Sequence, residues 1–187
     1  MLTLWRSLIQ SKIDYCSQLW SPSDQATISK LEGVARSFTS RITGMDNLDY
    51  WERLEQLGMY SQERRRERYQ IIFIWKLSQG LVTGYTLQFQ HSDRRGLYVT
   101  VPPSMASQSP ASVRKAREAS LKVKGARLFN LVPKEIRNLS GVSVDSFKNK
   151  LDSWLTQIPD QPTIPGRQRA AITNSLIDQV VACHKTI

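Results

Sequence analysis

The sequence predicts a mainly α-helical protein: a helical bundle followed by a small α+β basic unit with a short two-stranded ribbon. Apolar residues recur at helical spacings of three and four in the first part of the chain and again near residue 150. Between these regions, glycines, prolines and serines surround one alternating run, Leu97–Val101, which is typical of a short strand. Because 40% of the 187 residues are apolar, the chain is able to bury a core.

The helical bundle is expected over residues 1–88. The spacing predicts one helix over about residues 2–16, and a second that starts after residues 21–24 and stops before Gly44. A third follows residues 47–49 and ends at Gly58, and a fourth runs from Ser61 to about Ser78. This fourth helix begins with the charged segment SQERRRER and continues with the apolar segment YQIIFIWKL. We therefore expect it to be the central helix, with its charged amino-terminal end projecting from the bundle.

The basic α+β unit is expected over residues 89–158. Leu97–Val101 is one candidate strand and Ser120–Lys124 is a second. The two could pair as a ribbon with lysines on its solvent-exposed face. A helical turn at 126–130, another after Pro133 and a strong helix capped by Ser143 complete the unit. Residues 159–187 are predicted to be a proline-containing linker and a mobile tail with one weak helix, Ser175–Val181.

The positive charge is concentrated in the middle of the chain. The formal net charge is +10, and residues 61–150 carry 17 Lys and Arg against 6 Asp and Glu, a net of +11. A concentrated field of this sign attracts polyanions, of which nucleic acid is the commonest. No apolar run is long enough to span a bilayer, and the amino terminus lacks a signal-peptide pattern. We expect an intracellular protein, nuclear or cytoplasmic, with no membrane partner.

The first candidate nucleic-acid-binding cluster opens the fourth helix and consists of Arg64, Arg65, Arg66 and Arg68. Guanidinium groups on exposed helical turns can hold phosphate oxygens in a bidentate fork. Cations near a helix amino terminus oppose the helix dipole, which indicates that a partner compensates them. The alternative is a solvated helix face, partly neutralised by Glu63 and Glu67.

The second candidate cluster lies in a tract where basic and apolar residues interleave, as a folded basic surface requires. Its members are Arg114, Lys115, Arg117, Lys122, Lys124 and Arg127. Exposed rings for stacking on bases are few, so we expect backbone contacts and salt-sensitive, largely sequence-independent binding. We expect the two clusters to converge into one continuous surface.

No catalytic, metal or cofactor site is predicted. Zinc needs about four Cys or His ligands at close spacing, whereas here Cys183 and His184 are adjacent and Cys16 and His91 stand alone. His91 has no nucleophile beside it in a known motif, and the glycines form no phosphate-binding loop.

An ordered set of short motifs resembles the region after the palm in reverse transcriptases of jockey-like non-long-terminal-repeat retrotransposons. The motifs are Cys16-Ser17-Gln18-Leu19-Trp20-Ser21-Pro22, Glu63 with Arg64–Arg66, Gly80-Leu81-Val82, Arg127-Leu128-Phe129-Asn130 with Pro133, the stretch from Gly141 to Lys148, and Pro159-Asp160-Gln161-Pro162. The resemblance implies a thumb and carboxy-terminal region that holds RNA, an RNA/DNA hybrid or target DNA and contacts the rest of the reverse transcriptase. The metal-binding aspartates of the palm and the endonuclease have no counterpart here, so the resemblance implies no enzymatic activity. The zinc knuckle of some relatives is missing, and Val132 stands where leucine is expected.

Two rival interpretations remain at this stage. One is a host-adopted or decayed helical interaction module with no specific ligand. The other is a peripheral membrane binder, which is disfavoured because the basic residues accompany polar loops and not one long amphipathic helix.

Overall fold

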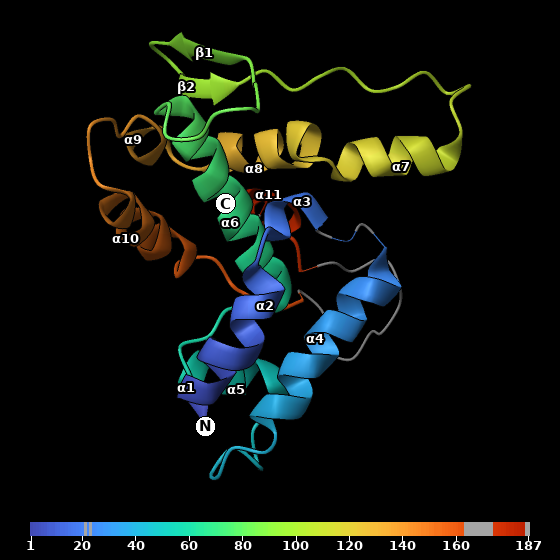
Figure 1. The fold of residues 1–187 in the computed structure, drawn as a ribbon, viewed down its shortest axis with the longest axis vertical. Helices are drawn as coiled ribbons and strands as arrows, with labels where there is room; N and C mark the ends of the chain where they lie inside the picture. Colours follow the sequence, from blue (N-terminus) through green and yellow to red (C-terminus); the bar gives the residue numbers. More distant parts are fainter. Residues whose placement is uncertain (21, 23, 163–173, 186–187) are drawn as a thin grey trace.

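The computed structural model describes residues 1–20, 22, 24–162 and 174–185, and it is mainly helical with one two-stranded sheet. Helix α6 (Gln62–Ser78) runs through the centre of the molecule (Figure 1). The helices that precede it in the chain lie around its amino-terminal half, and the ribbon, α8 (Ala126–Leu131) and much of α10 (Val144–Leu155) lie around its carboxy-terminal half. The predicted fold class is therefore confirmed, including the central position of this helix.

The predicted first helix forms as three consecutive segments: α1 (Leu2–Leu4), the π-helical η1 (Trp5–Gln10) and α2 (Ser11–Asp14). A short helix that the pattern did not predict, α3 (Ser17–Trp20), follows directly. Cys16 stands between α2 and α3 with a positive φ of 50°. This left-handed residue turns the chain, so that α3 contacts α6.

Side-chain caps set the start of the next helices as the sequence predicts. Asp24 accepts a hydrogen bond from the backbone N–H of Thr27 at the start of α4 (Gln25–Thr39). Asp49 forms a capping box with Glu52 at the start of α5 (Tyr50–Gln56), and Gly58 follows with a φ of +57°. The hydroxyl of Ser61 accepts from the backbone N–H of Arg64 at the start of α6.

The ribbon pairs different segments from those expected. β2 (Gly96–Val99) confirms the first predicted strand, but its antiparallel partner is β1 (Phe89–Ser92). The prediction that Ser120–Lys124 is the second strand is wrong, because η2 (Leu121–Gly125) is a helical turn. A Cβ on Gly125 would lie 2.6 Å from Cδ1 of Leu121 and 3.0 Å from Cδ1 of Ile74. Glycine thus allows η2 to pack closely against α6.

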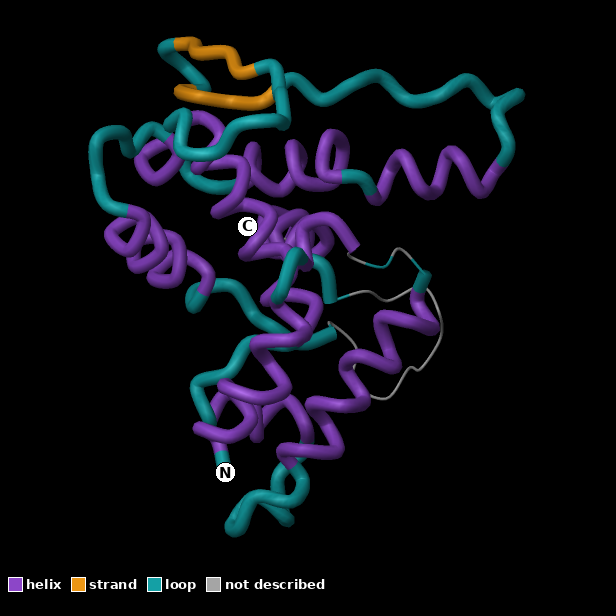
Figure 2. Tube along the Cα trace, viewed as in Figure 1, coloured by secondary structure: helices purple, strands orange, loops and turns teal. Residues whose placement is uncertain are grey.

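Helix α7 (Ala111–Ala119) was not predicted, and none of its residues is buried. The preceding segment, 100–110, extends beside it (Figure 2). The Arg117 guanidinium donates a hydrogen bond of 3.0 Å to the Pro103 carbonyl, which joins the two. Residues 100–119 therefore form an arm with little core of its own.

The remaining helices follow the predicted order. They are α8 (Ala126–Leu131), α9 (Lys134–Arg137), α10 (Val144–Leu155) and α11 (Leu176–Lys185). Ser143 caps α10, as predicted. The weak helix expected on a mobile tail is α11, and its packing corrects that expectation, because Leu176 is fully buried. Most of the predicted linker, 163–173, lies outside the described residues.

The described core has two parts. A small cluster of Trp5, Ala35, Tyr50 and Leu54 joins η1, α4 and α5. The larger cluster combines the second half of α6 with β2, η2, α8, α10 and α11, and a stacked pair, Trp75 and Phe147, lies within it. The division into units at residues 88 and 158 stays a prediction, but α6 contributes to the same core as the segments that follow it.

Within the described ranges, no helix combines the length and the apolar character needed to cross a bilayer.

Candidate nucleic-acid interface

The charged first half of α6 is enclosed by the protein. Arg64 has no exposed surface and Arg66 is 3% exposed, while Arg65 and Arg68 are half-buried. The prediction that this end of the helix projects outward with its arginines exposed is therefore wrong. Side chains four residues apart lie on the same face of a helix, and each face of this segment contacts a different neighbouring segment.

The acidic face of α6 consists of Glu63 and Glu67, which hold the start of α11. The Glu63 carboxylate accepts from the backbone N–H of Asn174 at 3.1 Å, and Glu67 accepts from the backbone N–H of Leu176 at 2.7 Å. Lys124 approaches Glu67 to 2.9 Å, so this predicted phosphate ligand is already paired. Burial and the adjacent Glu67 carboxylate raise the pKa of Glu63 to about 7.

One basic face of α6, Arg64 and Arg68, holds the carboxy-terminal half of α10 and the segment after it. The Arg64 guanidinium donates to the carbonyls of Ile158 and Pro159, at 3.2 and 2.8 Å. Arg68 forms a bidentate ion pair with Asp152, with an Nη2–Oδ2 distance of 2.7 Å. These two arginines bind the protein's own chain where phosphate was expected.

The face of α6 toward the amino-terminal helices is likewise occupied. Arg65 forms a bidentate ion pair with Asp14 of α2, with an Nη2–Oδ2 distance of 2.6 Å. The Gln62 side chain donates to Gln10 at 3.0 Å. The Glu32 carboxylate of α4 accepts from the backbone N–H of Gln62, and burial raises the pKa of Glu32.

Of the four arginines in the predicted cluster on α6, Arg66 has the fewest direct partners. Its Nε and Nη1 atoms are buried and donate no hydrogen bond within the described part of the chain. Burial lowers its pKa, and the carboxylates of Glu63, Glu32 and Glu67 oppose that shift. Arg66 thus offsets the charge of three nearby carboxylates and is not accessible to a polyanion.

The second predicted cluster lies on α7, η2 and the start of α8, and much of it is accessible. Lys115 and Lys122 are exposed, and Arg114 and Arg117 are half-exposed. Arg127 is exposed and pairs with Glu118 at 2.7 Å. Since both side chains of that pair are more than a third exposed, the pairing is weak and a phosphate could compete for Arg127.

Three cations of this cluster lie around one cavity, but carboxylates line the same cavity. Lys115, Lys124 and Arg127 line one cavity of about 310 Å³ together with Glu63 and Glu118. The Lys115 ammonium also contributes to the lowered pKa of Asp24, after the hydrogen bonds from Thr27. The α7–η2 segment is therefore the remaining candidate interface, and the arginines of α6 do not extend it.

Sequence reasoning missed two exposed cations, Arg94 and Arg95, on the turn between β1 and β2. The Arg95 guanidinium lies 5.9 Å from the ring centroid of Tyr98. The turn sequence Asp93-Arg94-Arg95-Gly96 between two strands was the signal available. Arg137, also basic, is 7% exposed and donates to the carbonyls of Val132, Leu97 and Arg95, so it fixes β2 to α9.

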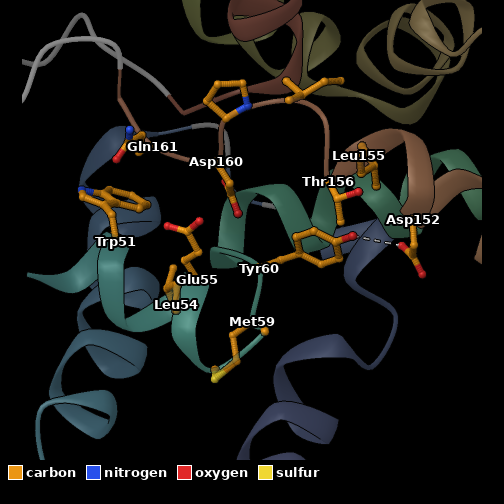
Figure 3. Close-up of a pocket in the computed structure, with 13 residues that line it drawn as sticks. Trp51, Leu54, Glu55, Met59, Tyr60, Asp152, Leu155, Thr156, Asp160 and Gln161 are labelled. Carbon is orange, nitrogen blue, oxygen red and sulfur yellow. Dashed lines mark hydrogen bonds between the residues drawn. The ribbon is translucent and has the colours of Figure 1, made fainter. Parts of the chain in front are cut away.

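A cavity of about 680 Å³ between α5 and α10 has the opposite character. Glu55, Asp152 and Asp160 line it without any Lys or Arg, and apolar side chains such as Trp51 and Leu54 form the rest of the wall (Figure 3). The Tyr60 hydroxyl donates to Asp152 across one end of the cavity. Carboxylates repel phosphate, so this cavity is not part of a nucleic-acid interface.

Among the described residues, no group of three or more His, Cys, Asp or Glu side chains is placed to hold a metal ion. No family model, curated protein or solved structure matches the chain.

Proposed function

We propose that this chain is a non-catalytic, nucleic-acid-binding part of a jockey-like non-long-terminal-repeat retrotransposon reverse transcriptase. It would grip the phosphate backbone of RNA, an RNA/DNA hybrid or target DNA, in the nucleus or cytoplasm. The observation that carries the proposal is the concentration of accessible cations on the α7–η2 segment. Residues 111–125 hold five Lys and Arg against one Glu, on a helix with no buried residue and on the helical turn that follows it.

The accessible cations of this segment are its proposed phosphate ligands. Arg114, Lys115, Arg117 and Lys122 have no carboxylate partner at ion-pair distance among the described residues. Long flexible cations on an arm can follow a sugar-phosphate chain without reading bases. The Lys122 ammonium lies 5.8 Å from the ring centroid of Tyr85, so an aromatic side chain accompanies the cations.

Two further observations support the family assignment. The ordered motifs described above extend over nearly the whole chain. Apolar side chains also lie exposed along the first helices, namely Leu4, Leu8, Tyr15 and Leu19, each more than 60% exposed. Apolar surface of this kind favours contact with another part of a larger protein, such as the rest of the polymerase.

A salt titration of binding tests the proposal. We expect the logarithm of the affinity for an RNA/DNA hybrid to fall with the logarithm of the salt concentration, with a slope of about −3 to −4 for four phosphate contacts. The Arg114→Ala and Lys122→Ala variants should each reduce the slope by about 1. The matched controls are Lys30→Ala and Arg41→Ala, exposed cations of α4 and the turn after it.

A flat slope, or equal weakening by the control variants, would contradict the proposal. Parallel titrations with RNA, duplex DNA and hybrid identify the preferred ligand. The exposed apolar side chains of the first helices also fit a second function, a helical interaction module without a nucleic-acid ligand. No binding of any of the three nucleic acids would favour that alternative, whereas unaltered binding by the Arg114 and Lys122 variants would contradict the role of the α7–η2 segment.

A further inference from the structure

A second cavity, of about 400 Å³, shares Gly58, Met59, Tyr60 and Asp152 with the acidic one. Four cations line it, and they come from three elements: Arg6 from η1, Arg65 and Arg68 from α6, and Lys148 from α10. Asp152 is the one acidic residue in its lining. The residues that line the cavity therefore carry a net charge of +3, although Asp14 and Asp145, which lie outside the lining, pair with Arg65 and Lys148.

The two α6 arginines keep donors available despite their ion pairs. Arg65 uses Nε and Nη2 to bind Asp14, and Arg68 uses the same two atoms to bind Asp152. Nη1 of each guanidinium donates no hydrogen bond to the described residues. A guanidinium carries five N–H donors, so one edge can be fixed by a carboxylate while the remaining nitrogen binds a ligand. The ion pairs hold the two groups in place before a ligand arrives.

The other two cations are free to move onto a ligand. Arg6 is exposed and forms no ion pair with the described residues. Lys148 pairs with Asp145 at 2.9 Å, but the Asp145 side chain is 84% exposed. Such a surface pair contributes little, so Lys148 can exchange its partner for an anion.

Aromatic rings form another part of the wall. Tyr60 and Tyr69 line the cavity, and the guanidinium carbons of Arg65 and Arg68 lie 5.6 and 5.7 Å from the ring centroid of Tyr69. The cavity falls within the usual size range for small-molecule sites, about 300–1,000 Å³, and is larger than a phosphate ion requires. Its lining thus combines cations for a phosphate group with flat rings for an attached aromatic base.

We infer that this cavity binds a nucleoside monophosphate unit, with its phosphate between Arg6, Arg65, Arg68 and Lys148 and its base against the tyrosine rings. The unit is either a free nucleotide or the 5′-phosphorylated end of a nucleic-acid strand. The site is separate from the α7–η2 segment and does not depend on the proposed function.

Calorimetric titration of the full chain with adenosine 5′-monophosphate tests the inference. We expect saturable binding at one site, weaker binding of inorganic phosphate that competes with the nucleotide, and no binding of adenosine. The double variant Arg6→Ala/Lys148→Ala should weaken nucleotide binding by about tenfold or more, because two charge-assisted contacts are lost. Neither residue takes part in the buried network of α6, so the fold should persist.

The matched control is Lys12→Ala/Lys150→Ala, which also removes one exposed cation from the amino-terminal helices and one from α10. Neither control residue lines the cavity. Unchanged nucleotide binding by this control supports the inference. No saturable binding by the unaltered protein, or equal weakening in both double variants, overturns it.

Oligonucleotides with a 5′-phosphate or a 5′-hydroxyl distinguish the two sources. If the protein prefers the phosphorylated strand and the Arg6→Ala/Lys148→Ala variant loses that preference, the site binds a strand end. If the protein binds the nucleotide but shows no such preference, the site binds a free nucleotide. The Arg114→Ala and Lys122→Ala variants should bind the 5′-phosphorylated and the 5′-hydroxyl strand more weakly by the same factor. Failure of the α7–η2 interface is therefore distinguishable from failure of this site.

Discussion

Replacing Arg64 with alanine should destabilise the protein by about 3–5 kcal/mol, which is the usual result of removing one partner from a buried charged contact. The side chain has no exposed surface, and its guanidinium donates to the carbonyls of Ile158 and Pro159. Hydrogen bonds from charged donors contribute about 1.5–3 kcal/mol each, so two of them give the same magnitude. The loss is a large fraction of the roughly 5–15 kcal/mol that stabilises a typical domain.

Urea unfolding followed by tryptophan fluorescence measures this change. The Arg64→Lys variant keeps the charge but cannot reach both carbonyls, so its loss should be intermediate. The control, Arg41→Ala, removes an exposed arginine and should change the free energy of unfolding by less than about 0.5 kcal/mol. Full stability of Arg64→Ala together with lost hybrid binding would refute the structural role and restore the phosphate-binding one.

Two further predictions concern the neighbourhood of α6. The raised pKa of Glu63 means that its contribution to stability is present below the ordinary carboxyl value of about 4.5 and is lost as pH rises through about 7. The free energy of unfolding should therefore fall between about pH 5 and about pH 8, and in the Glu63→Gln variant this fall should be smaller by on the order of 3 kcal/mol. The same pH profile in both proteins would contradict this. Gly125→Ala should destabilise by about 1–3 kcal/mol because its Cβ would overlap side chains of η2 and α6, as thermal unfolding would show. Gly33→Ala, inside α4 with no atom within 4 Å of the new Cβ, should instead stabilise by up to about 1 kcal/mol, and equal effects of the two substitutions would argue against the packing of Gly125.

The helices with strong local signals could be predicted from the sequence. Asp24, Asp49, Ser61 and Ser143 each cap a helix where the pattern placed its start. Caps and helical periodicity act over a few residues, so the chain itself specifies them before any tertiary contact forms.

The segments that were missed depend on contacts between distant parts of the chain. Leu121 and Val123 are buried and Lys122 is exposed, an alternation that fits a strand as well as a tight helical turn. The contact of η2 with α6 decides between them, and the sequence contains no local sign of that contact. β1 was missed for a related reason, because its residues Phe89–Ser92 have little apolar alternation and depend on pairing with β2.

For the arginine cluster of α6, a correct physical premise led to a wrong prediction of exposure. Cations at a helix amino terminus do need compensation, and nucleic acid was one source of it. The structure supplies compensation from within, through Asp14, Asp152 and the carbonyls that follow α10. These acceptors lie 51 to 95 residues from the arginines in the chain, so spacing could not reveal them. Burial decides which cations a polyanion can reach: Arg64 and Arg66 are at most 3% exposed, whereas Arg114, Lys115 and Lys122 are accessible. By that criterion Arg114, Lys115 and Lys122 remain candidates for phosphate binding, and Arg64 and Arg66 do not. We therefore expect variants of Arg64 and Arg66 to lower stability, and variants of Arg114, Lys115 and Lys122 to lower nucleic-acid affinity.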